Sequence, residues 1–212
     1  MSLVLAALLG YVLGAIPFGL IIGRLARGID LRAVGSHRTG ATNALRALGM
    51  RWAAVVLVLD IAKGVAAVLL ARAVFADDPL VEWAAAVAGF AAIVGHNWSV
   101  FIRFTGGRGV ATSAGAIGAM SIWTVVVLAP VVFGIIWRTR YVSLGSIAGS
   151  LLAPVVTAIL WAFDLATVPA IACALASGLL VTAAHADNIG RLRAGTERRI
   201  GEKAEVSPSG TR

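Results

Sequence analysis

The sequence predicts an all-α integral membrane protein with seven transmembrane helices, and its composition and polarity pattern support that prediction. Of the 212 residues, 59% are hydrophobic and 13% are charged, and the mean hydropathy is +0.92. An ordinary soluble domain has about twice that share of charged residues. Apolar stretches long enough to cross a hydrocarbon core alternate with three short polar stretches. We therefore expect a single polytopic membrane domain over residues 1–201.

The first apolar stretch covers residues 2–23. No lysine or arginine precedes it, whereas Arg24 and Arg27 follow it. A secretory signal peptide has the opposite order, because its positive region comes first. We therefore expect a retained first span with the amino terminus outside.

The positions of lysine and arginine orient the next spans, because short cytoplasmic loops are enriched in both residues. The arginines between residues 24 and 51 place the first loop inside. The link at 72–79 contains two aspartates and lies outside on this model, and Arg103 and Arg108 return the chain to the inside. Apolar stretches occur at 2–23, 52–71, 80–102, 110–137, 142–160 and 168–184.

The long stretch at 110–137 decides the number of spans. If it crossed once, Arg138 and Arg140 would lie outside, and so would the arginine-rich segment after residue 190. An even number of crossings keeps these charges inside. We therefore expect two short helices with a turn near 119–123, which gives seven spans; the alternative is five spans plus a re-entrant helix pair.

Both arrangements place the three polar stretches and the carboxyl terminus in the cytoplasm. All but Lys63 and Arg72 of the 18 lysines and arginines are then cytoplasmic. Residues 202–212 are expected to form a disordered cytoplasmic tail.

The composition also argues against several kinds of function. A net charge of +8 would suggest nucleic acid in a soluble protein, but no basic domain stands apart from the spans here. The single cysteine, Cys173, lies in an apolar run and permits no internal disulfide. Three histidines on separate segments, without matching carboxylates, do not form a metal-binding pattern. We expect no metal and no cofactor.

The second polar stretch, residues 106–112, has the composition of an anion-binding loop. Three glycines surround Arg108 and continue into a helix predicted to begin near Val110. Free amides at a helix start attract phosphate, and Thr112 adds a hydroxyl. The Gly-Lys-Ser/Thr ending of a nucleotide-binding loop is missing, so we expect no nucleotide. The alternative is that the glycines only permit a tight turn between spans.

The first polar stretch, residues 35–43, continues into a short helix predicted over 39–48 and ended by Gly49. Thr42, Asn43 and Arg46 would share its polar side, where Ser36 can reach the same anionic ligand. Alternatively, Ser36 or Thr39 only caps the helix and Arg46 extends to lipid headgroups.

The third polar stretch begins at His185, which closes the last span. Asn188 and Arg191 follow at i+3 and i+6, on nearby faces of a continuing helix. A neutral imidazole at that depth can accept a proton, and Asn188 can orient a substrate group. The alternative is an interfacial histidine bonded to a carbonyl group.

Further polar residues lie within or beside the spans. Asp60 and Lys63 are three residues apart in the second span, where an unpaired charge costs roughly 2.5–3.5 kcal/mol, so we expect a structural ion pair. We expect His96 and Asn97 to support the glycine stretch, and His37 to be an exposed loop residue.

At these residues the chain resembles the PlsY family, the bacterial acyl-phosphate-dependent glycerol-3-phosphate acyltransferases. Members have a Gly-Ser-Gly-Asn-x-Gly-Ala-Thr-Asn motif followed by Arg, a Gly-Gly-Lys-Gly-Val-Ala-Thr loop, and a His-x-x-Asn-Ile-x-Arg-Leu motif followed by Gly-Thr-Glu. The similarity runs from about residue 14 to 201. The matching residues are Gly35, Ser36, Gly40 to Asn43 and Arg46; Gly106 to Thr112; and His185, Asn188, Ile189, Arg191, Leu192 and Gly195 to Glu197. Secondary matches are Ile16 to Gly19, Asp60, Lys63 and Gly64, and Gly95 to Asn97.

The chain departs from the family pattern at a few positions. His37 and Arg38 replace a glycine and an asparagine, Thr105 stands where lysine is common, and Ala186 stands where arginine is frequent. Arg108 replaces the loop lysine, which keeps the charge but changes a point donor into a planar fork.

The resemblance implies acyl transfer from acyl phosphate to the 1-hydroxyl of sn-glycerol 3-phosphate, giving 1-acyl-glycerol 3-phosphate (lysophosphatidate) and phosphate. The expected partners are these two substrates and membrane lipid, with no nucleic acid and no obligate protein partner. The expected location is the bacterial inner membrane, with the site facing the cytoplasm. The expected catalytic residues are His185, Asn188, Ser36 and Arg46, and the expected phosphate-binding residues are Gly106, Gly107, Arg108, Gly109, Thr112, Thr42, Asn43 and Arg191.

Three alternatives stay open. A substrate phosphate can take the hydroxyl proton in place of His185. The departures from the motifs allow a paralogous acyltransferase with another acceptor or donor. A small-molecule permease is less compatible, because transporters place polar residues near the bilayer midplane.

Overall fold

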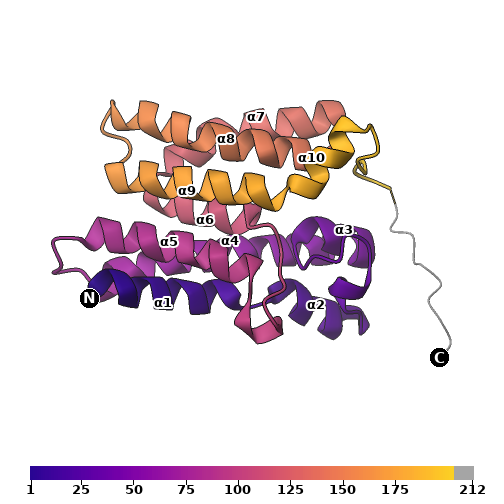
Figure 1. Ribbon diagram of the computed structural model, residues 1–212, viewed down its shortest axis with the longest axis horizontal. Coiled ribbons are helices and arrows are strands. Elements are labelled where there is room, and N and C mark those ends of the chain that lie inside the picture. The colour runs from indigo at the N-terminus through magenta and orange to yellow at the C-terminus, as the bar shows by residue number, and fades with distance from the viewer. Residues whose placement is uncertain (203–212) are drawn as a thin grey trace.

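Ten α-helices and two short 3-10 helices make up the regular structure of residues 1–202, the part of the chain that the computed structural model describes (Figure 1). The tail predicted for 202–212 lies, apart from its first residue, outside the described residues. The helices are α1 (Ser2–Ala15), α2 (Phe18–Arg27), η1 (Leu31–Ala33), α3 (Ala41–Leu48), α4 (Met50–Val74), α5 (Val81–Asn97), η2 (Val100–Ile102), α6 (Val110–Met120), α7 (Ile122–Thr139), α8 (Val142–Trp161), α9 (Val168–Ala184) and α10 (Ala186–Arg193).

Several helices are long and apolar enough to cross a membrane. Four stretches pass on length and hydropathy: Ser2–Arg27, α4, α7 and α8. Helices α9 and α10 together form a fifth, with a bend of 58° between them. Helices α5 and α6 are apolar but shorter, at 17 and 11 residues. The predicted spans at 142–160 and 168–184 are confirmed as helices to within one residue.

The third predicted span needs correction, and the first contains a break. The expected first span, residues 2–23, lies within the candidate span Ser2–Arg27, whose helix is interrupted between Ala15 and Phe18 because Pro17 has no backbone N–H to continue the ladder. We expected the third span to reach residue 102, but α5 ends at Asn97. The segment after it folds into a turn that is closed by a bridge between Ser99 and Thr105.

The predicted turn near 119–123 is confirmed, because α6 and α7 meet at Ser121. This residue has extended backbone angles, with φ −150° and ψ 96°, so it cannot continue either helix. Its buried hydroxyl donates to the Leu165 carbonyl at 3.0 Å and accepts from the Thr124 hydroxyl at 3.2 Å. The break between α6 and α7 is therefore an ordered turn stabilised by hydrogen bonds, and not a frayed helix end.

The helices form two packed groups. In one group α1 packs on α5 and α4 packs on α6; in the other α8 packs on both α7 and α9. Helix α9 also contacts α5 and α6 and joins the groups. Helices α1 and α5 approach each other closely because Gly10 and Gly14 of α1 lie directly on the backbone of Ala88 and Ala92 in α5.

The short helices gather at one end of the bundle. Figure 1 shows α2, α3 and α10 at the right, whereas the amino terminus and the link between α4 and α5 lie at the left. All three polar stretches therefore reach the same end of the molecule.

The charged pair in α4 is confirmed as a buried ion pair. Lys63 Nζ lies 2.9 Å from Asp60 Oδ1, and both side chains are 3% exposed or less. Helical spacing of i and i+3 makes this geometry available within one turn.

Candidate active site

The glycine stretch forms a buried loop that leads into α6. Gly106, Gly107 and Gly109 are buried, and α6 begins at Val110 as predicted. Gly109 has φ +80°, a conformation that favours glycine. No side chain caps the first turn of α6, so its backbone amides are available as donors to an anion.

Buried hydroxyls lie in the same turn. The hydroxyls of Thr112 and Ser113 have no hydrogen-bond partner among residues 1–202. Buried polar atoms of native proteins are nearly always bonded, so a ligand or water is expected beside them.

Arg108 connects the glycine loop to the other helix group. Its Nε donates to the Ala184 carbonyl at 3.1 Å, and Nη2 donates to Asp187 Oδ2 at 2.7 Å. Burial lowers the pKa of Arg108 and Asp187 opposes that effect; the guanidinium stays charged. Asp187 is itself held ionised: burial raises its pKa, but Arg108 and Arg191 outweigh burial, so the net shift is downward.

His185 is at the corner between α9 and α10. Its Nδ1 lies 2.8 Å from the Val181 carbonyl. A carbonyl can only accept, so Nδ1 has the proton, and in the neutral ring Nε2 is left as an acceptor. The hydrogen bond from His185 to a backbone carbonyl, which the alternative interpretation expected, is therefore present. The same bond leaves Nε2 able to accept a proton.

Asn188 is fixed by a buried carboxylate. Its Nδ2 donates to Glu197 Oε1 at 2.7 Å, and Glu197 also accepts from Ser143 at 3.0 Å and from Arg191 Nε at 2.8 Å. Because a carboxylate only accepts, the amide orientation is forced. Asn188 Oδ1 is then buried without a partner among residues 1–202 and can accept from a donor.

The first polar stretch is organised around Asn43. Its Nδ2 donates to the carbonyls of Leu31, Val34 and Arg38, and its Oδ1 accepts from the Ser36 amide at 3.0 Å. All of these partners are backbone atoms, so the Asn43 side chain ties the loop to α3. Its role as a phosphate contact stays a prediction, as does that of the half-buried Ser36.

Arg46 and Thr42 face the segment after α10. They line a cavity of about 240 Å³ whose other walls are Leu45, Met50 and residues 200–202. Burial lowers the pKa of Arg46, and repulsion from Arg198 and Arg108 acts in the same direction. Arg46 is therefore near enough to Arg108 of the glycine stretch and to Arg198 for their positive charges to repel.

The predicted short helix is confirmed as α3, with Gly49 at its carboxyl end. The helix starts at Ala41 with Gly40 as its N-cap, and no side chain caps it. Neither Ser36 nor Thr39 therefore acts as the cap that the alternative interpretation required.

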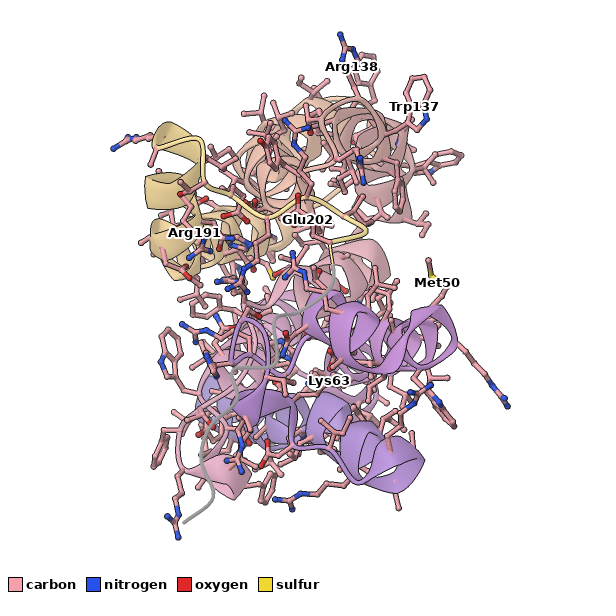
Figure 2. The ribbon with its side chains drawn as sticks, turned by 90° about the vertical axis from the view of Figure 1, so that its right-hand side faces the viewer. Met50, Lys63, Trp137, Arg138, Arg191 and Glu202 are labelled. Carbon is pink, nitrogen blue, oxygen red and sulfur yellow. The ribbon has the colours of Figure 1, made fainter. Side chains whose placement is uncertain are left out.

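The view onto this end of the bundle shows how these parts are arranged (Figure 2). Glu202 lies near the middle of the face, Arg191 lies to its left, and Lys63 lies among the helices of the lower group. Trp137 and Arg138 point outward at the top, away from the predicted site residues.

Sequence reasoning did not assign roles to Asp187 and Glu197. Asp187 lies 2.7 Å from Arg108 and 3.3 Å from Arg191, and Glu197 holds Asn188 and Arg191. The i,i+4 spacing of Asp187 and Arg191 was the available signal. Nothing in the sequence pattern pointed to the contact with Arg108.

Known proteins are similar to this chain over nearly its whole length. A family model described as glycerol-3-phosphate acyltransferase matches residues 4–195. The glycerol-3-phosphate acyltransferase of Shouchella clausii is 43% identical over 203 residues, which cover 95% of this chain and 98% of that relative. Glycerol-3-phosphate acyltransferase 1 of Deinococcus radiodurans is 44% identical over 205 residues, with 96% and 98% coverage. A crystal structure of PlsY (YgiH), an integral membrane glycerol 3-phosphate acyltransferase in its glycerol 3-phosphate form, superposes with a TM-score of 0.83 at 37% identity, covering 95% of this chain and 96% of that chain.

Proposed function

We propose, from the premise that this chain belongs to the glycerol-3-phosphate acyltransferase family, that its acyl donor is an acyl phosphate and its product is 1-acyl-glycerol 3-phosphate. The all-helical integral membrane fold is that of PlsY. The observation that carries the proposal is the meeting of an uncapped helix start, Arg108 and Asn188 at one end of the bundle.

The reaction needs no covalent enzyme intermediate. The 1-hydroxyl oxygen forms a bond with the acyl carbon, and the bond from that carbon to the phosphate oxygen breaks. Phosphate leaves with the electron pair, and the hydroxyl proton passes to a base. His185 Nε2 is the base that the hydrogen bond to Val181 leaves available.

Asn188 orients the acceptor in this proposal. Its Oδ1 is an acceptor, so it can take a hydrogen bond from the glycerol hydroxyl but not from an acyl carbonyl oxygen. The same contact would hold the hydroxyl close to His185.

The positive groups and free amides hold the two phosphates. The free amides of Val110 to Thr112 at the start of α6 and the Arg108 guanidinium suit one phosphate, and Ser36, Arg46 and Arg191 suit the other. In the cavity beside α3, the apolar walls of Leu45, Met50 and Ile200 suit the start of an acyl chain.

We also propose seven spans, with this end of the bundle facing the cytoplasm of the inner membrane. The spans are α1 with α2, then α4 to α9, and the even pair α6 and α7 keeps the arginines on one side.

Labelling in whole cells tests this topology. A membrane-impermeant maleimide is expected to label Asp78→Cys and Ile122→Cys in intact cells, because both positions then lie at the outer face. Arg138→Cys should need permeabilised cells. Labelling of Ile122→Cys only after permeabilisation would favour the re-entrant pair, and labelling of Arg138→Cys in intact cells would contradict the orientation.

The donor is tested on the purified protein. Glycerol 3-phosphate is supplied with acyl phosphate, acyl-CoA or acyl-carrier protein, and lysophosphatidate and released phosphate are both measured. We expect equal amounts of the two products with acyl phosphate and at least about a hundredfold slower transfer from the other donors, because only acyl phosphate presents its leaving group to the phosphate-binding groups. Equal rates with acyl-CoA would contradict the proposed donor, and phosphate release without acceptor would indicate hydrolysis.

A further inference from the structure

Three short motifs that lie outside the proposed site meet directly beneath the glycine loop. Lys63 Nζ donates to the Ile16 carbonyl at 3.0 Å, at the break between α1 and α2. Asp60 Oδ1 forms an ion pair with Lys63 Nζ at 2.9 Å, and His96 Nδ1 lies 3.5 Å from the same oxygen. All three side chains are 6% exposed or less. The first span, α4 and α5 are thereby joined at one buried point.

His96 is the member of this cluster that contacts the loop. Its carbonyl accepts from the Gly107 amide at 3.1 Å. Its ring lies so close to Gly107 that a Cβ at that position would overlap Nε2. A Cβ at Gly106 would likewise overlap the carbonyl oxygens of His96 and Asn97. The end of α5 therefore sets the path of the loop. Only glycine fits at positions 106 and 107, where the loop passes over α5.

The same cluster supports the elements on either side of the loop. Gly64, next to Lys63, lies on the Thr112 carbonyl in the first turn of α6. The Thr39 amide donates to the Gly106 carbonyl at 3.4 Å, and Gly19 lies directly on the Thr39 carbonyl. The first polar stretch and the start of α6 thus both pack against the residues that surround the buried cluster.

We propose that His96, held by the Asp60–Lys63 pair, is a positioning residue that fixes the amides of the glycine loop for phosphate binding without touching the substrate. The ring acts as a spacer between Asp60 and Gly107. The inference rests on the proposed role of the glycine loop as a phosphate site.

A second-site suppression experiment tests this role. Gly107→Ala, His96→Ala and the double variant are purified, and kcat and KM are measured for both substrates, together with yield and melting temperature. Gly134→Ala is the matched control, because an added Cβ there meets no atom within 4 Å.

We expect Gly107→Ala to lower kcat/KM by about a hundredfold, because its Cβ pushes the loop off the ring, and a displacement of about 1 Å has such an effect. His96→Ala should raise the KM for one substrate by about tenfold and change kcat by less than about threefold, because binding is loosened and the reacting groups remain. The double variant removes the overlap and should be at least about tenfold more active than Gly107→Ala. A residue that only stabilised the fold would make the two losses add.

The outcomes separate the inference from the function it rests on. The assays use whichever acyl donor the wild-type protein accepts, so a wrong donor does not affect them. A double variant no more active than Gly107→Ala, or an unchanged KM in His96→Ala, would overturn the positioning role. If Gly107→Ala does not fold, recovery of folded protein in the double variant supports the overlap, and the KM of His96→Ala decides the role.

Discussion

Replacement of Arg108 by alanine is expected to lower kcat/KM by about a thousandfold, since the change removes the fork that we propose holds a substrate phosphate. Two of its nitrogens are already fixed, one on Ala184 and one on Asp187, so the side chain is preorganised before substrate arrives. A fixed donor costs no reorganisation in the transition state, which is why its loss is large. Turnover of purified Arg108→Ala with both substrates measures the effect.

Two further variants make the Arg108 prediction specific. Arg108→Lys should recover part of the activity, because it keeps the charge but loses the planar fork. Arg138→Ala should behave as wild type, because Arg138 points away from the site (Figure 2). A folded Arg108→Ala protein with a near-normal rate would show that the Arg108 side chain holds no reacting phosphate.

Asn188→Ala is the second large effect, with an expected loss of about a thousandfold in kcat. The reason is the buried Oδ1, which has no partner among residues 1–202 when Nδ2 is bound to Glu197 and which we propose accepts from the glycerol hydroxyl. Without this acceptor the hydroxyl is no longer held near His185. The loss should appear in kcat more than in the KM for glycerol 3-phosphate, whose phosphate contacts are untouched.

Ser143→Ala is the matched control for Asn188. It removes another donor to the same Glu197 oxygen and leaves Asn188 Oδ1 in place. A hydrogen bond to a charged group contributes about 1.5–3 kcal/mol to stability. Glu197 keeps its bonds to Asn188 and Arg191 in this variant, so the loss of activity should stay below about tenfold. If Ser143→Ala and Asn188→Ala lost equal activity, the effect would belong to Glu197 and not to the Asn188 acceptor.

Much of the fold could be predicted from the sequence because membrane helices depend on length and charge. The turn at Ser121 followed from charge parity, and the bounds of α8 and α9 followed from hydropathy. The break at Pro17 was missed because the apolar stretch continues across it, so hydropathy gives no sign of an interrupted ladder. The early end of α5 was missed for the same reason: Val100 to Ile102 are apolar but form a separate short turn.

The candidate site could be predicted in its motifs but not in its contacts. The helix starts and the loop glycines have local sequence signals, so α3, Gly109 and Val110 were placed correctly. The contact of Arg108 with Asp187 joins residues far apart in the chain, and no local pattern encodes it. The orientation of Asn188 likewise depends on Glu197, whose burial only the folded chain reveals.

The bridge from Arg108 to Ala184 and Asp187 has one more consequence. It joins the two helix groups, which otherwise contact each other through α9 and a cluster of mostly small apolar residues. If Arg108 holds a substrate phosphate as we propose, a slight separation of the two groups would weaken catalysis while every helix stayed intact.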